Sequence, residues 1–310
     1  MRVSPKFAWW YSHTERFLYW FTLNVTMFKA HHLEIIHQYV SYCVKKKDVS
    51  PTKFHHSTHP YSRKQSTFEL LKKAEENLVI FSPRLLCLPD ISVSFVEYSR
   101  IPLLDLYKEK KNDPNVTYVM ALTGAYSLIY FSYGKRTLKY TKCTMSSFPG
   151  ISFTEIDPTK HKKGKLEDMP KPENWDKLHW GVYKERKDPK RSSVEVGKIL
   201  GVSYQTVLTR FREILKTCQI WMPFFPSGYP NYAKYIISLK TDYEIGLIEE
   251  LEKLDRSSYV YKTNDTLILT IFFDRHLEID SFLKLEKKGV IHDMRVSFPV
   301  DSSNIFYEKW

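Results

Sequence analysis

A cluster of polar side chains stands at the start of a predicted helix in the C-terminal half of the chain. Its candidate residues carry hydroxyl, amide or guanidinium groups: Ser203, Tyr204, Gln205, Thr206, Thr209, Arg210 and Arg212. Hydroxyl and amide groups bind phosphate oxygens or base edges; glutamine can bridge N6 and N7 of adenine, and arginine O6 and N7 of guanine. This set therefore predicts contact with double-stranded DNA. The alternative is that these residues only cap the helix and face solvent.

A matching set occurs in the N-terminal half, because the chain repeats itself. Gln205 lies 140 positions after Gln65, and Tyr259 lies 141 positions after Tyr118. This spacing is too long for a solenoid repeat and indicates two copies of one domain pair. The earlier copy offers a second group of candidate DNA-binding residues: Arg63, Lys64, Gln65 and Ser66.

Three short helices must position the later cluster. Ser192 supplies an N-cap hydroxyl for a helix that Gly201 ends, and Ser203 caps the next helix. The last two helices, joined by a Gly-Val-Ser turn, are typical of a helix-turn-helix, which places its second helix in the major groove of DNA. In the earlier copy, residues 51–60 contain three histidines and little apolar surface. We therefore expect the second helix of that copy to have decayed.

Beyond each helical region the pattern changes to mixed strands and helices. In the later copy we expect strands at 232–239, 258–262, 267–273 and 294–300, and helices at 243–253 and 277–288. In the earlier copy we expect strands at 92–98, 117–122, 126–133 and 151–156, and helices at 102–111 and 137–146. Each copy then follows the β-α-β-β-α-β order of a ferredoxin-like domain. The predicted fold class is α+β, with two tandem copies of a winged helix-turn-helix and a ferredoxin-like domain.

Composition shifts set the expected domain boundaries. Residues 158–174 are rich in Lys and Pro and nearly free of apolar side chains, so we interpret them as a linker that contributes to no core. The expected units are an extension (1–30), a degenerate helix-turn-helix domain (31–88), a ferredoxin-like domain (89–157), the linker (158–174), a helix-turn-helix domain (175–229) and a second ferredoxin-like domain (230–310).

The extension contains a mostly apolar segment, Phe17 to Phe28. Crossing a bilayer takes about 20 residues, so this segment is too short for a transmembrane helix. We interpret residues 1–30 as an appended aromatic helix or as translated upstream sequence, with an interfacial membrane anchor as the alternative.

Charge and cysteine usage narrow the class of protein. The 47 Lys+Arg exceed the 35 Asp+Glu, for a formal net charge of +12, which favours a polyanionic partner, nucleic acid before membrane. A generally basic, solvated surface is the alternative. The four cysteines include no Cys-x-x-Cys pair, which favours a reduced, cytoplasmic protein without structural zinc. No phosphate-loop or dinucleotide motif occurs, so we expect neither a cofactor nor a bound metal.

Residues 175–300 resemble the feast/famine regulators of the Lrp/AsnC family. The resemblance rests on SSVEVGKILGVSYQTVLTRFREIL at 192–215 and on the Pro-containing segment 222–230. Residues 33–157 resemble the same family more weakly in the DNA-binding part, and their segment 122–126 looks like the Thr-Gly hairpin of the family. That hairpin implies an amino-acid-like effector near Thr123, Gly124 and Tyr126, although Gly124 could serve only the positive φ of a turn.

The resemblance implies a sequence-specific transcriptional regulator that is not an enzyme. Family members dimerise through their ferredoxin-like domains. This chain would therefore form a covalent pseudo-dimer with two unequal DNA-binding domains. It could also form homo-oligomers through the same ferredoxin-like domains. One alternative is a ligand-binding or tetrapyrrole-binding enzyme, because sirohaem decarboxylases resemble these regulators. A second alternative is an oligomerisation partner of a regulator that does not itself bind DNA.

Overall fold

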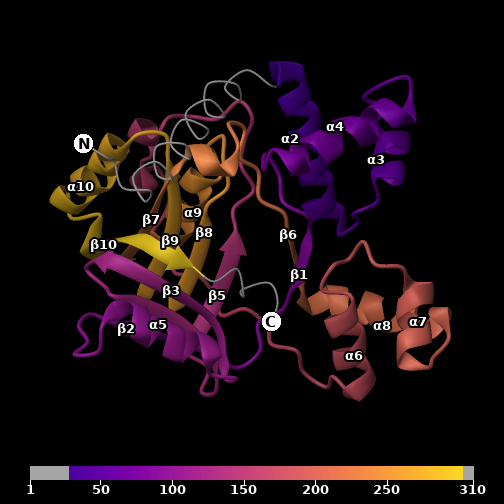
Figure 1. The fold of residues 1–310 in the computed structure, drawn as a ribbon. Coiled ribbons are helices and arrows are strands. Elements are labelled where there is room, and N and C mark those ends of the chain that lie inside the picture. Colours follow the sequence, from indigo (N-terminus) through magenta and orange to yellow (C-terminus); the bar gives the residue numbers. More distant parts are fainter. Residues whose placement is uncertain (1–27, 303–310) are drawn as a thin grey trace, which may run out of the picture.

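The computed structural model describes residues 28–302, so the apolar segment expected before residue 28 lies outside the described residues. Eight strands form one antiparallel sheet, and two short strands form a second (Figure 1). Helices pack beside both, so the α+β class is confirmed. Among the described residues, no helix is both long and apolar enough to span a membrane.

The second half follows the expected order from residue 233 onward. Its elements are β7 (Ala233–Thr241), α9 (Glu244–Leu251), β8 (Tyr259–Thr263), β9 (Thr266–Phe273), α10 (Asp280–Lys287) and β10 (Ile291–Ser302). The strands lie in the order β10-β7-β9-β8, which is the ferredoxin-like arrangement. Asn264 takes a positive φ of 50° in the tight turn between β8 and β9, as the hairpin signal predicts. The sheet face that α9 and α10 cover in this half buries an apolar core, called the outer core below.

The first half begins in the same way but ends differently. Its first elements are β2 (Ile91–Val96), α5 (Leu103–Asn112), β3 (Val116–Gly124) and β4 (Leu128–Tyr133), and the strands lie in the order β2-β4-β3. The helix expected at 137–146 is wrong, because Leu138–Cys143 forms strand β5. Tyr140 and Thr141 favour a strand, and the segment pairs with β8 at the end of the sheet.

The route of β5 joins the two halves. Thr137, just before β5, donates a backbone hydrogen bond to Ile91 of β2 (3.0 Å), after which β5 runs along β8 of the other half. The strand expected at 151–156 is also wrong, because it contains the 3-10 helix Phe153–Glu155. Strand β10 pairs with β3 instead, with Ser297 opposite Gly124. One sheet therefore runs continuously through both halves.

The sheet buries a different core on each face. On one face α5 covers the first half, while α9 and α10 cover the second. On the other face, side chains of both halves form a shared core that also takes in Trp221 and Met169. Because both halves contribute side chains to this face, a site on it would contain residues of each half.

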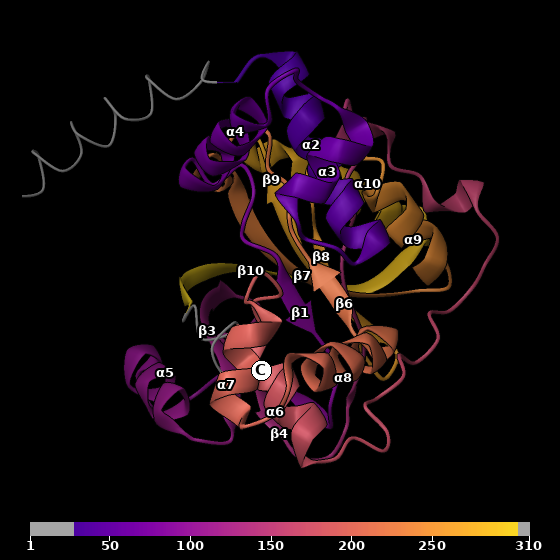
Figure 2. The same ribbon diagram turned by 90° about the vertical axis from the view of Figure 1, so that its right-hand side faces the viewer.

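Two helical units lie beside the sheet, with a two-stranded ribbon between them (Figures 1 and 2). The first contains α2 (Ala30–Lys46), α3 (Pro51–Thr58) and α4 (Lys64–Glu76), and the second α6 (Lys177–Glu185), α7 (Ser193–Leu200) and α8 (Tyr204–Thr217). The ribbon pairs β1 (Arg84–Leu86) with β6 (Gln219–Trp221). One apolar cluster includes residues of both units and of the ribbon.

The decay expected at 51–60 is wrong, since this segment forms the intact helix α3. Ser50 caps it by accepting the N–H of Lys53, and Pro51 stands at its first position, where a missing N–H costs nothing. Phe54 is fully buried, with its ring 5.1 Å from that of Tyr39. One large apolar residue therefore anchors a helix whose other residues are mostly polar.

The segment 158–174 is not a free linker, and the expectation that it joins no core is wrong. Met169 is buried in the shared core, and its N–H donates to the carbonyl of Lys139 (2.8 Å). The N–H of Leu166 donates to the carboxylate of Glu244 (2.8 Å), which is fully buried and paired with Lys262 at 2.7 Å. A few specific anchors dock an otherwise polar segment.

Candidate functional site

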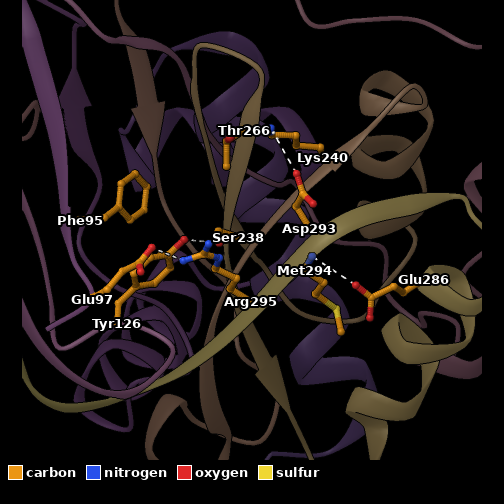
Figure 3. A pocket seen from close by; sticks show the side chains of 10 residues that line it. All are labelled: Phe95, Glu97, Tyr126, Ser238, Lys240, Thr266, Glu286, Asp293, Met294 and Arg295. Atoms are coloured by element: carbon orange, nitrogen blue, oxygen red, sulfur yellow. Dashed lines mark hydrogen bonds and ion pairs between the residues drawn. The ribbon is translucent and has the colours of Figure 1, made fainter.

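A cavity of about 580 Å³ opens between the two halves (Figure 3). The first half contributes Phe95 and Glu97 from β2 and its end, and Tyr126 from the turn before β4. The second half supplies the remaining lining residues: Ser238, Lys240, Thr266, Glu286, Asp293, Met294 and Arg295. A cavity of this size suits a small organic molecule.

Tyr126 is fixed at the boundary between the halves. Its hydroxyl and that of Ser238 lie 2.9 Å apart and share a hydrogen bond, and its backbone N–H donates to the hydroxyl of Ser297 (3.0 Å). The ring of Phe95 lies 4.9 Å from the ring of Tyr126. The pair presents an aromatic wall beside a hydroxyl group, so this part of the cavity can hold both an apolar and a polar portion of a ligand.

Two cations line the cavity, and each has a carboxylate partner. Arg295 pairs with Glu97 of the other half and stands 5.7 Å from the ring centre of Tyr126. Lys240 pairs with Asp265 at 3.1 Å and Asp293 at 3.2 Å. Hydrogen bonds to Asp265 and then Asp293 raise the pKa of Lys240, so this side chain is charged at neutral pH.

A bulge in β10 brings three consecutive residues to the cavity. The register of β10 against β7 shifts between His292 and Arg295, and Asp293 there takes a positive φ of 52°. In a regular strand, neighbouring side chains alternate between faces. The bulge breaks that alternation, so Asp293, Met294 and Arg295 can all line the cavity.

Of the three predicted effector residues, the structure brings only Tyr126 to this cavity. Thr123 is exposed and lies opposite Phe298 in the sheet. Gly124 has a φ of 111°, and a Cβ atom there would stand 2.6 Å from the carbonyl oxygen of Val296. The glycine is therefore required by the close approach of β10.

The other lining residues were missed by the sequence analysis. A weak signal exists for two of them, since Ser238 and Lys240 interrupt the apolar strand β7 at alternate positions. Glu97 and Arg295 stand almost 200 positions apart, and no local pattern relates them. Only the fold brings these two charges together.

The polar edge of α8 faces solvent. The hydroxyl of Ser203 accepts the N–H of Thr206 (3.1 Å), which caps the helix. Tyr204 is 49% exposed, and Thr206 is half-buried. The remaining exposed candidates are Ser203, Gln205, Thr209 and Arg212. Among the described residues, these exposed side chains are accessible to a partner.

Arg210 behaves differently from the rest of this edge. Its guanidinium pairs with Asp176 at 3.3 Å and with Glu213 at 3.0 Å, and Glu213 also lies 2.7 Å from Nε2 of His179. Hydrogen bonds from His179 and then Arg210 lower the pKa of Glu213. Arg210 thus holds the helical unit together, and a contact with guanine would require it to leave two carboxylates.

The first helical unit presents a similar edge on α4. Arg63, Lys64 and Gln65 are exposed, and Ser66 is half-buried. Gln65 donates to Glu69 (3.2 Å), which adds a negative charge beside the predicted contact. Both edges therefore combine basic side chains with nearby carboxylates.

Comparison with known proteins finds few relatives. The chain matches no family model and no curated protein. A crystal structure of the siroheme decarboxylase NirDL is similar at 9% identity, with a TM-score of 0.48, over 88% of this chain and 96% of that chain. The same enzyme in co-complex with an iron-uroporphyrin III analogue gives 9%, 0.47, 87% and 95%. Both structures are of an enzyme, and the prediction that this chain is not an enzyme is withdrawn.

Proposed function

We propose that the chain binds a small carboxylated compound in the cavity between its two halves. The observation that carries this proposal is the pairing of two cations, Lys240 and Arg295, with an aromatic and hydroxyl wall in a space of about 580 Å³. Arginine and lysine are the side chains that recognise carboxylates, and arginine can do so through two hydrogen bonds. The aromatic rings of Phe95 and Tyr126 would pack against the apolar part of the ligand.

The present partners of these cations leave room for a ligand. The side chains of Lys240 and Arg295 are 40% and 45% exposed, and those of Asp293 and Glu97 are 69% and 62% exposed. Ion pairs at such exposure are screened by water and contribute little, so exchanging one partner for a ligand carboxylate has a small cost. The hydroxyls of Tyr126 and Ser238 can then orient the ligand without moving.

Two sources could supply the carboxylate, and they share this chemistry. An amino-acid-like ligand would also place an ammonium group near Glu97, Glu286 or Asp293. A tetrapyrrole would present several carboxylates and a flat apolar ring. The strand order of each half supports the further proposal that the halves are diverged copies of an Lrp/AsnC-type unit, joined as a pseudo-dimer.

Titration of the full chain with each class of ligand tests the proposal. We expect saturable binding of either an amino acid from a complete panel, by calorimetry, or iron uroporphyrin, by absorbance. Arg295→Gln should weaken the binding by roughly 10-fold or more, because it removes a charge-assisted contact. Arg275→Gln, at an exposed arginine outside the cavity, is the matched control. Recovery of the ligand and its mass after incubation separates binding from turnover. Absence of binding by both classes, or equal binding by both variants, would refute the proposal.

DNA binding through α8 is a second candidate function, because its polar N-terminal edge is exposed. We expect Arg212→Ala to weaken binding to all duplexes and to reduce the salt dependence, since it removes one phosphate contact. Gln205→Ala should relax base preference at one position by about 1–3 kcal/mol. Lys198→Ala, on the preceding helix α7, is the control. No binding to mixed-sequence DNA at low salt would exclude this function.

A further inference from the structure

Two cysteines face each other where the two-stranded ribbon ends. Cys87 follows β1 directly, and Cys218 precedes β6 directly. The ribbon pairs Leu86 with Gln219, and the next pair in the same register is Cys87 with Cys218. Directly opposite side chains lie on the same face of a ribbon, so the two thiols are neighbours. Both side chains are buried, each at 1% exposure.

The backbone at this pair suits a disulfide. The N–H of Cys87 donates to the hydroxyl of Tyr183 (3.4 Å), and the N–H of Cys218 donates to the carbonyl of Ile214 (3.1 Å). The two residues therefore form a non-hydrogen-bonded pair, for which the Cα atoms lie roughly 4.5 Å apart. A disulfide needs Cα atoms about 4.4–6.8 Å apart, so the bond requires little backbone movement.

We propose that Cys87 and Cys218 are a redox pair that closes into an intramolecular disulfide. The bond would join the segments that connect each helical unit to the sheet, because β1 follows the first unit and β6 follows the second. This inference concerns a site outside the cavity and is independent of the function proposed above.

The reaction balances with an organic disulfide as the oxidant. The thiolate of Cys87 attacks one sulfur of glutathione disulfide, and the other glutathione leaves as a thiolate that takes up a proton. The thiolate of Cys218 then attacks the sulfur of Cys87 and displaces the second glutathione. Two protein thiols are oxidised, and one external disulfide is reduced to two thiols.

The surroundings assign these roles to the two cysteines. A hydrogen bond from Cys218 lowers the pKa of Cys87, and the hydroxyl of Tyr183 and the charge of Lys187 act in the same direction. Burial raises the pKa of Cys218. Burial also raises the pKa of Cys43 and of Cys143, each to about 12. Cys87 is therefore the thiol best able to start the exchange.

Access to the buried pair requires a local opening of the ribbon. The ladder between β1 and β6 has only three residue pairs, so separating it breaks few backbone hydrogen bonds, although it also uncovers buried apolar side chains of both strands. Once formed, the disulfide would close the chain from residue 87 to residue 218, a long loop. Such a closure restricts the unfolded chain and should raise the melting temperature by roughly 5–10 °C.

The test oxidises the full chain with glutathione disulfide in mild urea that leaves the protein folded. Free thiols are then alkylated in denaturant, and the peptides are mapped by mass spectrometry. We expect the peptides of Cys87 and Cys218 to be joined, and a reductant to separate them. Cys143→Ala should keep the cross-link, whereas Cys218→Ala should leave Cys87 alkylated or joined to glutathione. Recovery of both wild-type peptides alkylated, or joined only to glutathione, would overturn the proposal without use of any variant.

Discussion

Strand β5 and helix α10 occupy corresponding places in the two halves, yet one is extended and the other helical. The proposed duplication, at an offset of 141 positions, would align residues 138–143 with 279–284. In α10, Phe282 and Leu285 are buried three residues apart, Asp280 stands in the first turn, and Lys287 stands in the last. In β5 the buried residues Leu138 and Thr141 are also three positions apart, so burial spacing does not distinguish the two segments. What differs is that β5 pairs with β8 from Leu138 to Cys143. Under the proposed duplication, the available edge of β8, and not the position in the repeat, would decide the secondary structure of residues 138–143.

This difference makes the molecule asymmetric. The first half gives β5 to the edge of the second, and Phe153 and Ile156, which follow β5, pack in the outer core of the second half. In return, β10 of the second half pairs with β3 of the first. The halves are consequently not two independent domains, and each can be disrupted through residues of the other.

The largest loss of folding stability should come from substituting a residue of the first half that packs in the core of the second. Phe153 is 1% exposed, and its ring lies 4.6 Å from that of Phe273. Phe153→Ala should destabilise the protein by roughly 3–5 kcal/mol, because it leaves a cavity in that core. Urea denaturation measures this, with Phe81→Ala, a less buried aromatic, as the control. A loss below about 1 kcal/mol would mean that residues 151–156 are peripheral.

A buried carboxylate distinguishes α9 from α5. Glu244 is fully buried and pairs with Lys262, whereas the corresponding residue of the first half is Leu103. Glu244→Leu should cost about 3 kcal/mol, because it leaves Lys262 without its partner in a buried place. Adding Lys262→Met should recover much of the loss. If the double variant is less stable than the single one, the ion pair is not the cause of the effect.

The β3–β4 and β8–β9 hairpins should differ less in how a substitution at the turn changes stability. Gly124 of the first half lies against the backbone of β10, while Asn264 of the second is exposed in its turn. Gly124→Ala should destabilise by roughly 1–3 kcal/mol, since the Cβ atom clashes and the φ is unfavourable. Asn264→Gly should change stability by less than about 0.5 kcal/mol. Equal effects on the melting temperature would contradict the assignment of Gly124 to close packing.

The smallest effect on stability should come from the ion pairs that Glu213 forms with His179 and Arg210 in the second helical unit. Glu213 corresponds to Lys73 in the first unit, which therefore lacks this network. The pKa of Glu213 is lowered below its ordinary value of 4.5, so its contribution to stability is present above that pH and is lost as the pH falls through the lowered value. Glu213→Gln should flatten the dependence of the unfolding free energy on pH below about 5. An unchanged slope in urea titrations would show that solvent screens the network completely.

Much of the second half was predictable because its signals are local. Ser203 caps α8, the Asn264 turn closes a hairpin, and the apolar periods of 233–273 match the elements that form. The docking of Met169 was not predictable, since a single apolar residue in a polar segment has no period. The helix α3 was missed for the same reason, because Phe54 is its one buried apolar residue.

The sequence by itself determined the caps, the turns and the apolar faces, because these depend on neighbours within a few positions along the chain. Tertiary structure alone decided which strand β5 pairs with, since the residue pattern of a strand does not specify the neighbouring strand. It also decided the meeting of Glu97 with Arg295, of Tyr126 with Ser238 and of Cys87 with Cys218. Each of those pairs is separated by more than 100 positions, and the sheet and the ribbon bring the partners side by side.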